Sequence, residues 1–165
     1  RIKRFVDGGE QEFKLRAGTE NILGIIGLSK ALDLDLEIER VKKNRDYILE
    51  RLKEIKKIKI NGSIEKRIYN NINVSFYGIE GESLMLLLDK DSIYVSTGSA
   101  CSSYNLEESY VLRAINVDEL YTHGSIRISL DKDIDKEKAD YFIEKLKEHV
   151  DYLRKISPFK IKDEE

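Results

Sequence analysis

Two short segments of alternating polarity constrain the fold of this chain more than any other feature of its sequence. In residues 71–76, and again in residues 125–130, every second residue is apolar and its neighbours are polar. The apolar positions are Ile72, Val74 and Phe76 in the first segment, and Ile126, Ile128 and Leu130 in the second. Because successive side chains of a β-strand point to opposite faces, both segments are predicted to be strands with one buried and one polar face.

Helical periodicity accounts for much of the remaining chain. Residues 36–57 carry apolar side chains at spacings of three, four and seven, which predicts an amphipathic helix. The same pattern predicts a final helix through residues 139–153, with Asp135 as its N-cap and Pro158 at its end. Five other elements are expected: a buried helix over residues 22–31, a short helix buried all round over 84–88, a brief strand over 93–95, and short helices over 106–115 and 118–121.

These elements predict an α/β to α+β fold. One domain boundary is expected near residues 34–36. Residues 1–35 hold a loop and an apolar helix that need another body to pack on, whereas residues 36–165 alternate strands and helices that can form their own α+β core. The chain opens in Arg1 without an initiator methionine, which we interpret as the start of a fragment.

Composition excludes several classes of function. The 165 residues are 36% charged, with both signs interspersed and a net charge of -2, so no nucleic-acid-binding footprint is predicted. No apolar stretch is long enough to span a membrane, and there is no secretory signal peptide. A single cysteine, without any disulfide framework, is typical of a reducing compartment, so a cytoplasmic protein is expected.

That single cysteine, Cys101, is the first candidate for chemistry. It lies in a run of small and polar residues, 96–103, in which serine, glycine and alanine dominate. A free cysteine is often only a small buried hydrophobe. Buried cysteines, however, usually occur in apolar runs, and a cluster of small polar residues indicates a surface loop. The residues therefore leave both a structural and a reactive thiol open.

Two residues are candidates for binding an anion. Arg127 lies on the polar side of its predicted strand between Ser125 and Ser129, with room to bind a carboxylate, although an arginine facing solvent or paired to an internal acid fits as well. Thr19 follows Gly18 at a predicted helix start, so it is either an ordinary N-cap or part of a phosphate site.

The two histidines give weaker signals. His123 is either an acid–base group or a loop residue without a role, and His149 is expected on the exposed side of the last helix. Neither has cysteine or histidine neighbours at the spacing of metal ligands, so no metal site is predicted.

Taken together, three segments resemble one enzyme family. They are residues 16–21, 96–103 and 123–130, which contain Thr19, Cys101 and Arg127 respectively. In this order they resemble the C-terminal half of cysteine desulfurases, which are pyridoxal-phosphate enzymes of the class V aminotransferase group. Residues 71–76 and 78–84 look like the family's stretch before its cysteine, and the cysteine run looks like that of the iron–sulfur-assembly branch.

The resemblance implies a role for each candidate residue. Cys101 would be the nucleophile that takes sulfur from L-cysteine as a persulfide and leaves L-alanine. Arg127 would hold the substrate carboxylate. Thr19 would reach the phosphate of pyridoxal 5'-phosphate bound to the other subunit of a homodimer. An iron–sulfur scaffold or another acceptor protein would then receive the sulfur for cluster or thio-cofactor assembly.

The same resemblance implies how the chain is organised. Residues 36–165 would be the C-terminal small domain of a fold-type I pyridoxal-phosphate enzyme, and residues 1–35 the end of its large cofactor-binding domain. The cofactor lysine would lie upstream of Arg1, so this chain alone is expected to be inactive. Two alternatives remain, namely a non-catalytic persulfide carrier or docking module, and a relative such as a selenocysteine lyase.

Overall fold

The computed structural model describes residues 3–97 and 109–159. The chain divides into two units, Arg1–Leu36 and Glu37–Glu165, which are considered separately. The first unit contains one 3₁₀ turn, Glu12–Lys14, and helix α1, Ile22–Leu32. None of the residues of α1 is buried, so the expectation of a buried helix is not met within this chain. Several sides of the helix carry exposed apolar side chains. Among the described residues of this unit, Ala17 is the one apolar residue that is buried.

The start of α1 corrects one prediction about Thr19. The N-cap of α1 is Asn21, whose side-chain oxygen accepts a hydrogen bond from the Gly24 backbone N–H at 3.1 Å. An N-cap side chain reaches only the N–H groups of the first helical turn, and Thr19 lies two residues before the cap position. Thr19 is therefore not the cap, and its side chain is exposed.

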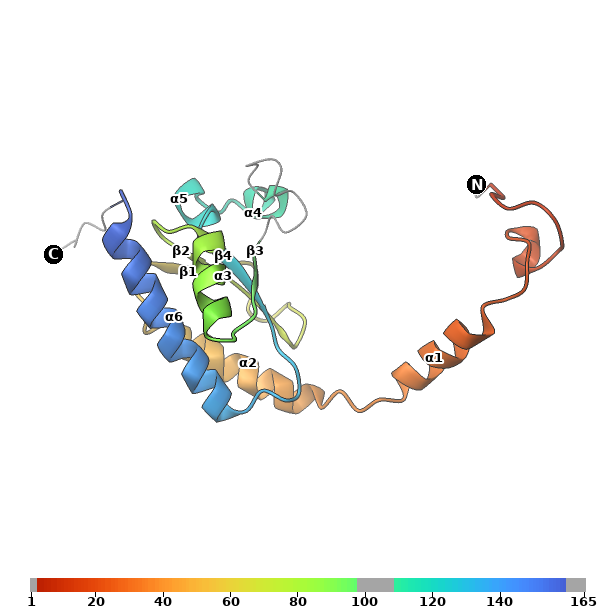
Figure 1. Ribbon diagram of the computed structural model, residues 1–165, viewed down its shortest axis with the longest axis horizontal. Helices are drawn as coiled ribbons and strands as arrows, with labels where there is room; N and C mark the ends of the chain where they lie inside the picture. Colours follow the sequence, from red (N-terminus) through yellow and green to blue (C-terminus); the bar gives the residue numbers. More distant parts are fainter. Residues whose placement is uncertain (1–2, 98–108, 160–165) are drawn as a thin grey trace. The chain divides into compact units, whose positions relative to one another are not determined.

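The second unit is an α+β domain built on one antiparallel sheet, which confirms the predicted fold class (Figure 1). The strands are β1 (Ile58–Ile60), β2 (Asn71–Phe76), β3 (Ser96–Thr97) and β4 (Ser125–Ser129). The helices are α2 (Ile38–Leu52), α3 (Gly81–Lys90), α4 (Tyr110–Ala114), α5 (Glu119–Thr122) and α6 (Lys136–Ile156). The strand order in the sheet is β1-β2-β4-β3, so the two alternating segments form its centre.

The sheet has one apolar and one polar face, as the alternation predicts. Strands β2 and β4 pair in antiparallel register, with Ile72 opposite Ile128 and Val74 opposite Ile126. These side chains are buried against α2, α3 and α6, which Figure 1 shows in orange, green and blue. The opposite face carries the pairs Asn73 with Arg127 and Ser75 with Ser125. The polar face is therefore the side of the sheet on which a binding site can form.

The long helices follow the sequence pattern closely. Helix α6 begins after Asp135, whose carboxylate accepts a hydrogen bond from the Lys138 N–H at 2.8 Å, as predicted. Its C-cap is Ser157, and Pro158 follows. Helix α2 occupies the middle of the predicted range, with Val41, Ile48 and Leu52 in the core.

Three shorter elements differ from the predictions. Strand β3 follows the predicted range of residues 93–95 instead of occupying it, because the residues that pair with β4 are Ser96 and Thr97. Strand β1 was not predicted, because it is only three residues long and its pattern is too short to read. Helix α3 is not buried all round, since Leu84 and Leu88 are fully buried whereas Leu86 is 61% exposed. Helix α3 packs on the sheet and on α6, and the side that carries Leu86 is left exposed.

Candidate functional site

Arg127 lies at the centre of β4, on the polar face of the sheet. Its backbone is placed between two strands, with Asn73 of β2 opposite on one side and Ser96 of β3 opposite on the other. The side chain is exposed, whereas Ile126 and Ile128 on either side are buried in the core. The sheet therefore fixes the position of the Arg127 backbone and leaves its guanidinium group available.

A pocket of about 410 Å³ opens beside Arg127. It is lined by polar residues of the sheet and the segment after β1, together with apolar residues of α4: Asn61, Gly62, Asn73, Thr97, Ser109, Val111, Leu112, Ile115, Ser125 and Arg127. None of these lining residues is an aspartate or glutamate. Within residues 3–97 and 109–159, no hydrogen bond or ion pair involves the Arg127 guanidinium. An arginine without a counter-ion in a pocket suits a carboxylate or another small anion.

Two asparagines form the wall of this pocket on the β2 side. The Asn61 amide nitrogen donates to Asn73 Oδ1 at 2.7 Å and to Ser75 Oγ at 2.7 Å. Asn61 is 4% exposed, so these hydrogen bonds are made in a nearly dry environment. Sequence reasoning missed both asparagines, because they carry no charge. The signal available was the position of Asn73 on the polar side of an alternating strand.

Arg67 holds the segment that brings Asn61 to the sheet. Its guanidinium donates to the backbone carbonyls of Asn61 at 2.6 Å and Ser63 at 2.8 Å. Burial lowers the pKa of Arg67, and repulsion from the Arg45 guanidinium adds to the effect. The guanidinium still stays protonated at neutral pH, because the ordinary pKa of an arginine lies far above neutrality. Arg67 is therefore a structural cation that fixes one wall of the pocket.

Thr19 lies in the other unit, so the structure does not bring it together with Arg127. Its side chain is exposed, and the Arg16 guanidinium donates to the Thr19 carbonyl at 3.2 Å. Gly18 has a positive φ of 103°, which favours glycine and turns the chain sharply before Thr19. An exposed hydroxyl beside a guanidinium is a donor set that suits a phosphate group.

Cys101 falls outside the described residues. The nearest described positions along the chain are Thr97, at the end of β3, and Ser109, the N-cap of α4. Both line the Arg127 pocket. The two described residues that flank residues 98–108 in the sequence are therefore both at this pocket.

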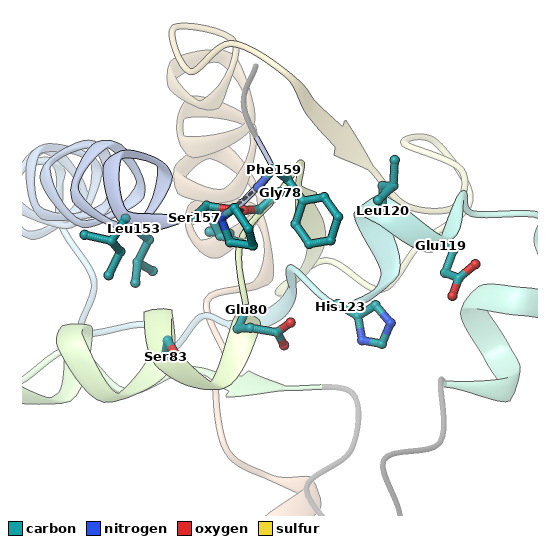
Figure 2. A pocket seen from close by; sticks show the side chains of 12 residues that line it. Gly78, Glu80, Ser83, Glu119, Leu120, His123, Leu153, Ser157 and Phe159 are labelled. Carbon is teal, nitrogen blue, oxygen red and sulfur yellow. Dashed lines mark hydrogen bonds between the residues drawn. The ribbon is translucent and has the colours of Figure 1, made fainter. Parts of the chain in front are cut away.

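The histidines lie away from the Arg127 pocket. His123 is among the residues that line a second pocket of about 320 Å³, where Figure 2 shows its ring and the Glu80 carboxylate on the same side. His149 is not exposed as predicted, because its Nε2 lies 2.6 Å from Asp91 Oδ2 across the contact between α3 and α6. Among the described residues, no group of histidine, cysteine and acidic side chains is arranged to hold a metal ion. In the same residues, no helix is long and apolar enough to cross a bilayer.

Known proteins similar to this chain form a consistent set. It is 47% identical over 166 residues to the protein named cysteine desulfurase IscS of Dictyoglomus turgidum, covering 97% of this chain and 42% of that protein. It is 46% identical over 168 residues to the protein of the same name from Methanosarcina thermophila, covering 99% of this chain and 42% of that protein. The chain thus spans about two fifths of the length of these relatives.

Solved structures agree with the sequence relatives. A structure described as a NifS-like protein superposes with a TM-score of 0.75 at 33% identity, covering 92% of this chain and 39% of that one. A NifS-like protein from Rickettsia africae ESF-5 gives a TM-score of 0.74 at 29% identity, covering 92% of this chain and 41% of that one. The family described as Aminotransferase class-V matches residues 6–142, which is well over half of the sequence. This chain therefore belongs to the class-V aminotransferase family.

Proposed function

We propose that the protein to which this chain belongs is a cysteine desulfurase, which takes sulfur from L-cysteine and releases L-alanine. The observation that carries the proposal is the Arg127 guanidinium, which lies without an acidic partner among the described residues in a pocket of the sheet's polar face. Support also comes from relatives named cysteine desulfurase that match nearly all of this chain at 46–47% identity.

In this proposal Arg127 binds the carboxylate of the substrate cysteine. A guanidinium and a carboxylate form two parallel hydrogen bonds, which fix both the position and the orientation of the substrate. The pocket suits this interaction, because its lining residues include no acid that competes for Arg127.

Cys101 then acts as the acceptor of sulfur. Its thiolate attacks the substrate sulfur, forming a sulfur–sulfur bond while the bond between that sulfur and the substrate carbon breaks. The electron pair of the broken bond stays with the carbon, which takes up a proton and becomes the methyl group of alanine. The outer sulfur of the Cys101 persulfide passes to a thiol of an acceptor protein, such as an iron–sulfur scaffold.

Pyridoxal phosphate, when bound, supplies the electron sink that stabilises negative charge on the substrate carbon. Thr19 is proposed to donate its hydroxyl to the phosphate group, since that side chain is exposed and lies beside Arg16. The phosphate would belong to the neighbouring subunit of a homodimer. The lysine that holds the cofactor is placed by this proposal in the part of the relatives' length that the chain does not span, so residues 1–165 alone are not expected to turn over cysteine. The protein is proposed to work in the cytoplasm.

The role of Arg127 is tested in the full-length protein with Arg127→Ala, Arg127→Lys and the matched control Arg113→Ala. Arg113 is an exposed arginine of α4 that does not line the pocket. Losing the forked interaction is expected to lower kcat/KM for L-cysteine about 100-fold in the alanine variant and less in the lysine variant, which keeps the charge. Arg113→Ala should match the wild type. Equal kcat/KM in Arg127→Ala and the wild type would contradict the proposal.

A further inference from the structure

Asn73 lies directly opposite Arg127 in the sheet. The two residues are paired in the antiparallel register of β2 and β4, and both line the same pocket. Directly opposed residues on one face of a sheet have their Cβ atoms about 4.5–5.5 Å apart. A small ligand held by the Arg127 guanidinium therefore lies within reach of the Asn73 amide.

The orientation of the Asn73 amide follows from its contact with Asn61. Asn73 Oδ1 accepts the hydrogen bond from Asn61, so its nitrogen is the end left for the pocket. No hydrogen bond to another described residue uses this nitrogen. The Asn61 amide nitrogen in turn donates hydrogen bonds to Asn73 Oδ1 and Ser75 Oγ.

The opposite orientation of the two amides is less favourable. It would leave the buried N–H groups of Asn61 without these two acceptors, and a buried unpaired donor is costly. In the observed orientation Asn61 keeps both acceptors, and of its polar side-chain atoms it is Oδ1 that is buried without a partner among the described residues. The arrangement therefore presents a guanidinium and an amide N–H to the pocket side by side, and both are donors.

We propose that Asn73, oriented by Asn61, is a second binding residue for the substrate carboxylate beside Arg127. The inference rests on the proposed desulfurase function for the identity of the ligand, but the donor pair itself suits any small carboxylate. Arg127 accounts for the charge of the ligand, and Asn73 adds a directional donor from the neighbouring strand. Asn61 is a positioning residue, which acts only through Asn73.

The test measures binding of 3-mercaptopropionate to the full-length protein by isothermal titration calorimetry. This probe has the thiol and carboxylate of cysteine but no amine, and propane-1-thiol serves as the counterpart in which a methyl group replaces the carboxylate. Asn73→Ala removes one hydrogen bond to the charged carboxylate, so we expect it to weaken binding of 3-mercaptopropionate about tenfold. Asn73→Asp keeps the shape and still provides an acceptor oxygen, but its charge should repel the ligand and weaken binding further.

Asn71→Ala is the matched control, because Asn71 lies on the same face of β2 with similar burial but does not line the pocket. It should bind both probes as the wild type does. Asn61→Ala should weaken binding of 3-mercaptopropionate about threefold or more, because Asn73 loses its orientation while its N–H groups remain present. Binding of propane-1-thiol should be the same in all variants, whereas general damage to the pocket would change it.

If Asn73→Ala and Asn73→Asp both bind 3-mercaptopropionate within twofold of the wild type while Arg127→Ala does not bind it, the role of Asn73 is refuted and that of Arg127 stands. If the wild type does not turn over cysteine but binding still depends on Asn73, the desulfurase proposal fails and the carboxylate site remains.

Discussion

Gly124 determines where β4 begins, and with it the position of Arg127 three residues later. Its carbonyl accepts a hydrogen bond from the Phe76 N–H at 3.0 Å, which joins the ends of β2 and β4. A Cβ atom at Gly124 would overlap the Phe76 carbonyl oxygen and would lie 3.0 Å from the Ile79 carbonyl oxygen. Both neighbours are backbone atoms and cannot move aside as a flexible side chain would.

Gly124→Ala is therefore expected to destabilise the full-length protein by about 2 kcal/mol or more, measured by urea denaturation. Gly27→Ala, compared with the parent chain of residues 1–165, is the control, because a Cβ added at this helical glycine meets no atom within 4 Å apart from its own helix. Alanine there should be neutral or stabilising, since it favours helix more than glycine does. Equal stability of Gly124→Ala and the wild type would show that β4 can shift without cost.

The residues of the site differ in how well the sequence reveals them. Arg127 was predictable, because strict alternation places it on the polar face between Ser125 and Ser129, and the structure confirms this placement. Asn61 was not predictable, because its contact with Asn73 depends on the pairing of β1 with β2. The functional roles of Arg127, Thr19 and Cys101 remain predictions.

At the scale of elements, helix α3 shows the limit of reading a short apolar run. Residues 84–88 are all apolar, so the sequence does not indicate which side of the helix faces the core. The structure shows that Leu84 and Leu88, four residues apart, are fully buried on one side. By contrast, the 21 residues of α6 provide enough turns for their periodicity to predict the buried side correctly.

Two leucines of α3 test this assignment. Leu84→Ala is expected to lower the free energy of unfolding by about 2–5 kcal/mol, because it removes a fully buried side chain and leaves a cavity. Leu86→Ala, at a position that is 61% exposed in the same helix, should change it by less than about 0.5 kcal/mol. Chemical denaturation of the full-length protein measures both, and similar losses in the two variants would argue against the assigned orientation.

At the scale of the whole molecule, the two units differ in how complete they are. Every residue of the hydrophobic core cluster lies in Glu37–Glu165, between Val41 and Leu153. In the first unit, the apolar side chains of α1 are exposed, and Leu23 is 86% exposed. The amphipathic patterns predicted a self-contained core from about residue 36 onward. They do not reveal what covers the apolar side chains of α1.

A protein consisting of residues 37–165 alone is therefore expected to fold cooperatively. It should give a dispersed NMR spectrum and a single unfolding transition in urea, because its core needs no side chain from residues 1–36. The chain of residues 1–165 is the control and should unfold at a similar urea concentration. A spectrum with collapsed dispersion for residues 37–165 would show that the core depends on the first unit.

The proposed function requires that the full-length protein transfer sulfur from L-cysteine to Cys101. The most direct measurement incubates the full-length protein with L-cysteine, traps persulfides by alkylation and identifies the modified peptide by mass spectrometry. We predict one additional sulfur atom on Cys101, released alanine, and loss of both the added sulfur and sulfur transfer in Cys101→Ser. Alanine release without sulfur on Cys101, or sulfur on Cys101 only when a separate desulfurase is added, would contradict this account.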